Sequence, residues 1–308
     1  MQKKVQFAVN YSKKASRLRR DGIIPIDYYK MPAWDSLIPE VMADHNAYVH
    51  FPLLVGDGHG DAFNHETGKT AVWSHMEAMQ KQTDTPYINL HLGASLGAYP
   101  DIVPDSLKKE DMERVLEATI RDTEAVVRRF GADKVIVENI PGGRRDNHLQ
   151  LCAMPEFING VVEATGCGLL LDISHARLAA HQVGWDVRPY INSLPVHRLR
   201  ELHITGVQPI GDVHLAWIRK LIDAGLYAPH DDAELEAMRG EWIDHVPMIE
   251  WDWPYMEWAA EMLKNGRWAS PWVVSLEYGG VGGLFEAVTE TAVLTEQVPR
   301  LYEIFNWE

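Results

Sequence analysis

Short apolar runs along this sequence end repeatedly in a histidine, a glutamate or an aspartate. The clearest case is LLLDISH at residues 169–175, where an unbroken apolar run ends in a carboxylate and an imidazole follows three residues later. Imidazole nitrogens and carboxylate oxygens, without thiolates, are donors that suit zinc, iron or manganese. One such residue at the end of a strand is usually only a satisfied polar group, so it is the repetition that indicates a metal site.

Six consecutive apolar runs carry these residue types at their ends. The residues are His50 (YVHFP), His91 (INLHLG), Glu138 (VIVENIPGG), Asp172 and His175 (LLLDISH), His203 (ELHITG) and Glu277 (VVSLEYGG). These groups exceed the needs of one ion, and they predict two or three divalent metal ions bridged by carboxylates. A single-metal site surrounded by supporting polar partners is the alternative interpretation.

The elements that must position these side chains are eight predicted strands. They cover residues 5–9, 23–28, 47–53, 87–92, 134–140, 168–173, 199–204 and 272–278. Most intervals between them have helical periodicity or enough residues for a helix, which is typical of parallel strands joined by crossovers. We therefore predict an α/β fold, a single (β/α)8 TIM barrel over residues 1–308, with the polar strand ends on the C-terminal face where barrel active sites lie.

Helical periodicity is clearest over residues 108–130, with acidic residues at its start, Arg128 and Arg129 at its end and Gly131 as a stop signal. Further helices are predicted over 155–163, 255–264 and 284–305, the last kinked near Pro299 because proline removes a backbone donor. Residues 57–68 form a glycine-rich loop. An insertion at about residues 207–254 separates the seventh and eighth strands.

The acidic balance of the chain argues against a polyanionic partner. The 308 residues include 44 acidic and 29 basic ones, for a formal charge of −15. Binding to nucleic acid requires neutralisation of phosphates, so a nucleic-acid substrate is disfavoured. The chain has 2 cysteines, too few for a disulfide framework, and no apolar run long enough to span a membrane. We expect a cytoplasmic protein that acts on a small-molecule or peptide substrate, with no membrane partner.

The order of the strand-end residues resembles the xylose-isomerase-like barrels, especially the endonuclease IV type. In those barrels a strand-end His, a second His, the Glu of an E-N motif, a D-x-x-H, a further His and a final Glu hold three metals. The matching residues here are His50, His91, Glu138 with Asn139, Asp172 with His175, His203 and Glu277. The resemblance implies a xylose-isomerase-like fold with a multinuclear metal site.

The stretch from MPEFINGVV to ELHITG, residues 154–206, is similar to another branch, the multinuclear non-haem iron-dependent oxidative enzymes (MNIO), which modify cysteine-containing peptides. Two departures stand out. That branch usually has Asn at the position of His175, and its D-T-H motif has no clean copy here. Two pairs compete for the role of that motif, Asp212 with His214 and Asp244 with His245. We prefer His245, because a helix and then the last strand follow it in the expected order.

We therefore expect a metal cluster at the C-terminal rim of the barrel. The predicted ligands are His50, His91, Glu138, Asp172, His175, His203, His245 and Glu277, and Glu138, Asp172 and Glu277 are the predicted catalytic carboxylates. Iron is favoured over zinc or manganese, and the resemblance implies an iron-dependent oxidative enzyme. The alternatives are a zinc- or manganese-dependent isomerase, epimerase or phosphoesterase, and a metal-dependent binding module without catalysis. Arg144 and Arg145 are candidates for an anionic substrate group.

Overall fold

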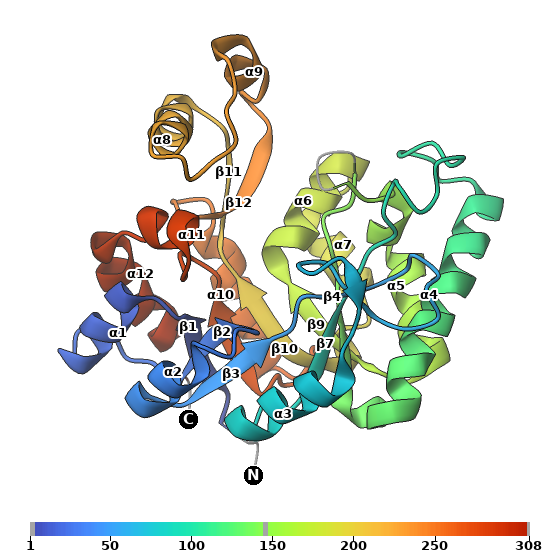
Figure 1. The fold of residues 1–308 in the computed structure, drawn as a ribbon, viewed down its shortest axis with the longest axis horizontal. Coiled ribbons are helices and arrows are strands. Elements are labelled where there is room, and N and C mark those ends of the chain that lie inside the picture. Colours follow the sequence, from blue (N-terminus) through green and yellow to red (C-terminus); the bar gives the residue numbers. More distant parts are fainter. Residues whose placement is uncertain (1–3, 144–146, 307–308) are drawn as a thin grey trace.

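The computed structural model describes residues 4–143 and 147–306 and shows a closed (β/α)8 barrel (Figure 1). Its strands are β1 (Gln6–Asn10), β2 (Tyr28–Pro32), β3 (Ala47–His50) continued by β4 (Leu53–Val55), β7 (Ile88–Leu92), β8 (Val135–Glu138), β9 (Gly168–Asp172), β10 (Leu199–Ile204) and β13 (Val273–Leu276). Neighbouring barrel strands pair in parallel, and β1 pairs with β13. The predicted barrel is confirmed.

The third strand of the barrel is split in two, because β3 pairs with β2 whereas β4 pairs with β7. Pro52 lies at the break and has no N–H to donate to a ladder. The side chain of Asn89 on β7 replaces the missing ladder bonds: its Oδ1 accepts from the N–H of Phe51 at 2.7 Å, and its Nδ2 donates to the carbonyl of Phe51 at 2.9 Å. The break follows His50 directly, so Asn89 also fixes the backbone beside a predicted ligand.

Helices cover the outside of the barrel (Figure 1). They are α1 (Lys13–Arg20), α2 (Ile38–Asp44), α3 (Trp73–Thr83), α4 (Lys109–Phe130), α5 (Pro155–Thr165), α6 (Ile173–Val183), α7 (Val187–Ser193), α10 (Trp253–Lys264), α11 (Gly283–Val288) and α12 (Thr291–Phe305). On α4 the buried side chains include Val115, Ala118 and Val126, which follow the helical period that the sequence predicts. Gly131 ends α4 with a φ of 87°, a conformation that glycine adopts without strain.

The second strand was predicted too early in the sequence. It begins at Tyr28, the last residue of the predicted range 23–28. Pro25 has no N–H to donate to a strand ladder. The carboxylate of Asp27 accepts the N–H of Phe7 on β1 at 2.9 Å, so a side chain rather than a backbone ladder contacts β1 before Tyr28. The true strand contains Lys30, and this charge interrupts the apolar pattern that predicts a buried strand.

The predicted helix over residues 284–305 is two helices, α11 and α12, and α12 continues through Pro299. The break lies at Thr289, whose hydroxyl donates to the carbonyl of Phe285 at 2.7 Å and accepts the N–H of Gly280 at 3.0 Å. A side chain that bonds nearby backbone groups competes with the helical ladder. Thr289 thereby ties the end of α11 to the loop that follows β13.

An arm rises from the C-terminal face of the barrel between β10 and α10 (Figure 1). It consists of the antiparallel pair β11 (Gly206–Pro209) and β12 (Trp242–Val246) with α8 (Asp212–Asp223) and α9 (Asp232–Ala237) at its tip. A small separate core of Ile210, Leu215 and Leu235 holds the tip together. At the root of the arm, a Cβ on Gly206 would overlap the carbonyl of Pro247, so only glycine fits there.

The glycine-rich loop that follows β4 is anchored by one buried carboxylate. Asp122 on α4 accepts the N–H groups of Gly56, Gly58 and Gly60 at 3.1, 2.9 and 2.6 Å. The loop then leads into a small hairpin formed by β5 (Phe63–Asn64) and β6 (Lys69–Thr70). Within residues 4–143 and 147–306, no helix is both long enough and apolar enough to cross a membrane.

Candidate metal centre

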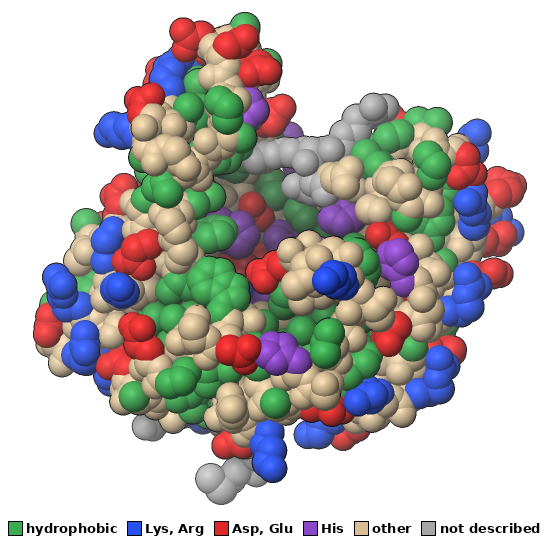
Figure 2. Space-filling view, in the orientation of Figure 1, with side chains coloured by type: hydrophobic (Ala, Val, Ile, Leu, Met, Phe, Trp, Pro, Cys, Tyr) green, Lys and Arg blue, Asp and Glu red, His purple; other side chains and the backbone are tan. Residues whose placement is uncertain are grey.

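A pocket of about 370 Å³ opens at the C-terminal end of the barrel, and histidine side chains lie in the hollow beneath the arm (Figure 2). The pocket is lined by six of the eight predicted ligands, which are His50, His91, Glu138, His175, His245 and Glu277. The other two, Asp172 and His203, are fully buried beside them. The structure therefore brings all eight side chains to one place, and metal binding by them stays a prediction.

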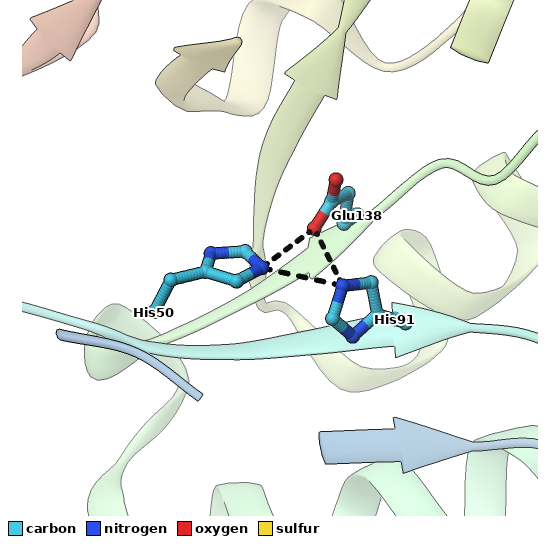
Figure 3. A group of neighbouring side chains, drawn as sticks. All are labelled: His50, His91 and Glu138. Carbon is cyan, nitrogen blue, oxygen red and sulfur yellow. Dashed lines mark hydrogen bonds and ion pairs between the residues drawn. The ribbon is translucent and has the colours of Figure 1, made fainter. Parts of the chain in front are cut away.

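The first group of candidate ligands comes from β3, β7 and β8 (Figure 3). His50 Nε2 and His91 Nε2 lie 3.2 Å apart, and each faces Glu138 Oε2, at 3.5 Å and 3.2 Å. Two imidazole nitrogens and one carboxylate oxygen thus converge on one point. Such a set can hold one divalent ion and leave coordination positions for further ligands.

The second group joins the barrel to the arm. Glu138, Asp172 and His175 place donor atoms within 4.8 Å of one another, and so do His175, Asp244 and His245. His175 Nε2 lies 3.7 Å from Asp172 Oδ2 and 3.3 Å from Asp244 Oδ2. His175 therefore lies between barrel carboxylates on one side and arm residues on the other.

The third group consists of Asp172, His203 and Glu277 on β9, on β10 and directly after β13. The Nδ1 atom of His203 lies 2.8 Å from Oε1 of Glu277. All three residues are at most 4% exposed. Asp172 belongs to both the second and the third group, so its carboxylate connects them.

Glu138 connects the first and second groups in the same way. Its Oε2 faces His50 and His91, whereas its Oε1 lies 3.5 Å from Nδ1 of His175. Within the described structure, Glu138 Oε2, Asp172 Oδ2, Glu277 Oε1 and His203 Nδ1 are among the buried atoms without a hydrogen-bond partner. Buried polar atoms normally have partners. The residues therefore fit a multinuclear metal site, because shared ions would satisfy these atoms.

A β-bulge in the arm explains how two consecutive residues can reach one site. Side chains of neighbouring strand residues normally point to opposite faces. In β12, however, Asp244 and His245 together oppose Val207 of β11, and His245 has a φ of 56°, which is left-handed. A bulge of this kind re-aims side chains. In a D-x-H motif on a regular strand, the Asp and His side chains point to the same face because they are two residues apart. The bulge allows the adjacent residues Asp244 and His245 to face the same site.

Hydrogen bonds from the ring fix the orientation of three histidines. In His91, His175 and His245, Nδ1 lies 3.0, 2.9 and 2.9 Å from a backbone carbonyl oxygen. A carbonyl can only accept, so Nδ1 carries a proton and the neutral ring has its lone pair on Nε2. In all three residues Nε2 is therefore the atom that a metal ion would bind.

The side chain of Asn139 holds the second group in place. Its Nδ2 donates to the carbonyl of Asp172 at 2.9 Å, and its Oδ1 accepts the N–H of Asp172 at the same distance. The Oδ1 atom of Asp172 accepts the N–H groups of Ser174 and His175, which caps α6. Only Oδ2 of Asp172 then remains to face the cluster.

Two residues of the centre were not predicted from the sequence. Glu201 Oε1 accepts from Nε2 of His203 at 2.8 Å, which directs Nδ1 of His203 toward the cluster. Glu201 precedes His203 by two residues on the same strand, and this spacing, which puts both on one face, could have revealed it. Lys30 is the other residue: its ammonium pairs with Oε1 of Glu277. No motif in the sequence marked it.

Burial and neighbouring charges shift the pKa values of several groups in the cluster. Burial would raise the pKa of Glu138, but the imidazoles of His91, His203 and His50 hold that pKa well below its usual value. Burial, reinforced by the ammonium of Lys30, lowers the pKa of His50 well below its usual value. The two shifts keep Glu138 as a carboxylate and His50 as a neutral imidazole, the protonation states in which they bind metals.

The pKa of His175 is raised, in contrast to that of His50, when no ion is bound. Burial would lower its pKa, but the carboxylates of Asp172, Asp244 and Glu138 raise it to about 9. Several negative charges therefore converge on one imidazole. A metal ion that took the place of this proton would meet the same favourable field.

The two candidate pairs for the remaining ligand lie in different parts of the arm. Asp212 and His214 are on α8, where Asp212 pairs with Arg239 at 2.9 Å and His214 Nδ1 accepts the N–H of Gly211. They take part in none of the donor groups of the described residues. Asp244 and His245 lie within the second group. Arg144 and Arg145 are outside the described residues.

A parallel barrel with nitrogen and oxygen donors at its C-terminal end belongs to the class of metal-dependent TIM-barrel enzymes. Residues 65–260 match the sequence model of the family described as RiPP precursor modification enzyme MbnB/TglH/ChrH. The match covers more than half of the chain, and the chain therefore belongs to this family, the multinuclear non-haem iron-dependent oxidative enzymes. The resemblance stated from the sequence is confirmed at this level.

Curated relatives are UPF0276 proteins. One from Caulobacter vibrioides is 27% identical over 147 residues, which are 44% of this chain and 48% of the relative. One from Pseudomonas aeruginosa is 30% identical over 129 residues, 41% and 43% of the two chains. The matched stretches thus span about half the length of these relatives or less. Among solved structures, D-psicose 3-epimerase with D-tagatose from Clostridium cellulolyticum H10 has a TM-score of 0.47 at 12% identity, over 98% of this chain and 97% of that chain.

Proposed function

We propose that this chain is an iron-dependent oxidative enzyme that modifies a small or peptide substrate at a bi- or trinuclear site. The observation that carries the proposal is the placement of Glu138, whose two oxygens face two different groups of donors. A carboxylate placed in this way is suited to bridge two ions. Glu138, Asp172 and Glu277 are the carboxylates that we assign to the catalytic centre.

The choice of iron is supported by the family and is compatible with the donors. Imidazole and carboxylate donors, with no thiolate, suit iron, zinc and manganese alike. The family comprises iron-dependent oxidative enzymes, and this favours iron. Iron bound in the cluster would supply one-electron and dioxygen chemistry, which no amino-acid side chain supplies by itself.

The protein's own contribution is to orient donors and to hold the substrate. The carbonyl bonds of His91, His175 and His245 fix their rings before any ion arrives. Trp34 and Phe285 line the pocket beside these polar groups. They give the substrate an apolar wall to pack against, and they reduce the access of water to the reacting group.

A peptide substrate is supported by the family description and by the shape of the entrance. The family modifies RiPP precursors, and the hollow beneath the arm is open to the surface in Figure 2. An open cleft lets an extended segment pass over the pocket while one side chain enters it. The resemblance to the oxidative branch makes cysteine the side chain that we expect there.

Metal analysis of protein purified without added metal tests the oxidative chemistry. We expect iron in the wild-type protein and far less of it in Glu138→Gln, which keeps the side-chain shape but removes the charge. Protein that contains only zinc or manganese would contradict the proposal of an iron-dependent oxidative enzyme and would favour an isomerase, epimerase or phosphoesterase. An exogenous ligand or an ordered water on the ions would favour an enzyme over a binding module, because catalytic sites keep an open position.

The substrate class needs a separate test. The chain would be co-expressed with cysteine-containing peptides encoded beside its gene, and the peptides would be weighed by mass spectrometry. We expect a mass change that requires the wild-type chain and is absent with Glu138→Gln. Unchanged masses for all such peptides, with iron present in the protein, would contradict a peptide substrate and leave a small molecule.

A further inference from the structure

The ammonium group of Lys30 lies among the candidate metal ligands. We propose that it takes the place of one metal ion, so that the cluster binds two divalent ions in the first and second groups while Lys30 fills the third. This inference rests on the proposed multinuclear site and specifies its composition. It also assigns a role to a residue that neither the sequence motifs nor the family match single out.

Lys30 reaches the centre of the cluster from β2. In the strand register it lies beside Asn10 of β1, close to the C-terminal end of the barrel. Its Nζ makes an ion pair with Oε1 of Glu277, and the two side chains are only 9% and 5% exposed. Lys30 is also the sole Lys or Arg among the described residues that line the pocket.

The oxygen that Lys30 contacts is the one that the third group would need for an ion. Oε1 of Glu277 lies 2.8 Å from Nδ1 of His203, which is the donor atom that His203 offers to the cluster. A divalent ion between these atoms would come into direct contact with the ammonium. Two positive charges at such a distance inside a protein repel each other strongly. The ammonium and a third ion therefore compete for one position.

Lys30 makes no ion pair with Glu138 or Asp172 in the described structure, although its charge also acts on both of them and on His50. In the described part of the chain, the ion pairs of Glu138 and Asp172 are all made with imidazoles, which can bind a metal once they are neutral. Lysine is different, because its ammonium only donates and offers no lone pair. The lysine ammonium thus contacts a carboxylate of the third group, whereas the carboxylates shared by the first and second groups pair with imidazoles.

The charge of the cluster points to the same composition. Its five carboxylates are those of Glu138, Asp172, Glu201, Asp244 and Glu277. Together they carry five negative charges, which two divalent ions and one ammonium neutralise. Buried charges are tolerated where they are paired. A third divalent ion beside Lys30 would leave an excess of positive charge in a buried site.

The test is the number of iron ions bound by the wild-type protein and by Lys30→Met. Methionine keeps most of the length of lysine and removes the charge. Each protein would be loaded anaerobically with iron(II), desalted and analysed for iron per chain. Lys109→Met is the matched control, because Lys109 is 81% exposed on α4. Circular dichroism would show whether each variant is folded.

We expect about two ions in the wild type and in Lys109→Met, and about three in Lys30→Met, where a divalent ion can use Glu277, His203 and Asp172. About three ions in the wild type, or an unchanged count in folded Lys30→Met, would overturn the inference and leave the proposed multinuclear site intact. If Lys30→Met does not fold, the number of iron ions bound by Lys30→Gln is compared with the number bound by the wild type, and the same two outcomes apply. A wild-type chain that binds no iron would overturn the proposed function together with this inference.

Discussion

The candidate ligands on the barrel and those on the arm are held in different ways. Glu138 and Asp172 end strands of a continuous parallel ladder, and their side chains are 2% and 0% exposed. Asp244 and His245 lie in a two-stranded ribbon, with side chains 18% and 41% exposed and a left-handed residue between regular pairs. In the proposed centre, the barrel therefore supplies the rigidly held donors, and the arm adds two donors that are more exposed to solvent.

The largest effect should come from the carboxylate shared within the barrel. Glu138→Gln removes the charge that faces both the first and the second group, so we expect metal affinity to fall by more than ~100-fold. Iron per chain, measured after dialysis, checks this. Glu113→Gln on α4, where the side chain is 61% exposed, is the control and should keep its iron. A Glu138→Gln protein with wild-type iron would show that the barrel groups do not share this residue.

A smaller effect should follow when a barrel histidine loses its orienting partner. Glu201→Gln weakens the bond that directs Nδ1 of His203 toward the cluster. Losing such a partner typically lowers metal affinity by about 10- to 100-fold, and we expect this loss for the third ion of the Lys30→Met variant, in which His203 can act as a ligand. A competition titration with a chelator would measure the change. Unaltered affinity would mean that His203 is held by packing alone.

Changes in the arm should cost less metal than changes in the barrel. His245→Asn and His245→Ala both remove one donor of the second group, and we expect the first group to keep its ion. Asn tolerates a left-handed φ better than Ala does, so His245→Ala should also melt at a lower temperature. Iron counts and thermal melts separate the two effects. Loss of all iron from either variant would show that metal binding depends on the arm as strongly as on the barrel.

The smallest effect is expected at the tip of the arm. His214→Ala removes an acceptor for the N–H of Gly211 at the start of α8, a contact that does not involve the cluster. Iron content should stay at the wild-type level, with only a slight change in melting temperature. A clear loss of iron would instead make Asp212 and His214 the remaining ligand pair and would contradict the preference for His245.

The barrel could be predicted because its strands are apolar runs whose polar ends mark the rim. Strand β10 was placed at its true bounds, and α4 differs by one residue from its predicted range. The alternation of apolar run and terminal ligand is a local pattern, so a sequence carries it plainly. Where the run contained a charge, at Lys30, the prediction of β2 was wrong.

Features that depend on contacts between distant segments were missed. The break between α11 and α12 depends on Thr289 bonding to the loop after β13, and no periodicity reports this. The bulge in β12 depends on its register with β11, so the sequence left two ligand pairs open. The interaction of Lys30 with Glu277 joins the second strand to the last, far beyond any local motif.

The most direct test of the shared metal centre is anomalous scattering from a crystal of iron-loaded protein, measured on both sides of the iron edge. We predict adjacent iron peaks within bonding distance of His91 Nε2, His175 Nε2 and the two oxygens of Glu138. Iron peaks elsewhere, or crystals of loaded protein in which these side chains coordinate nothing, would contradict it.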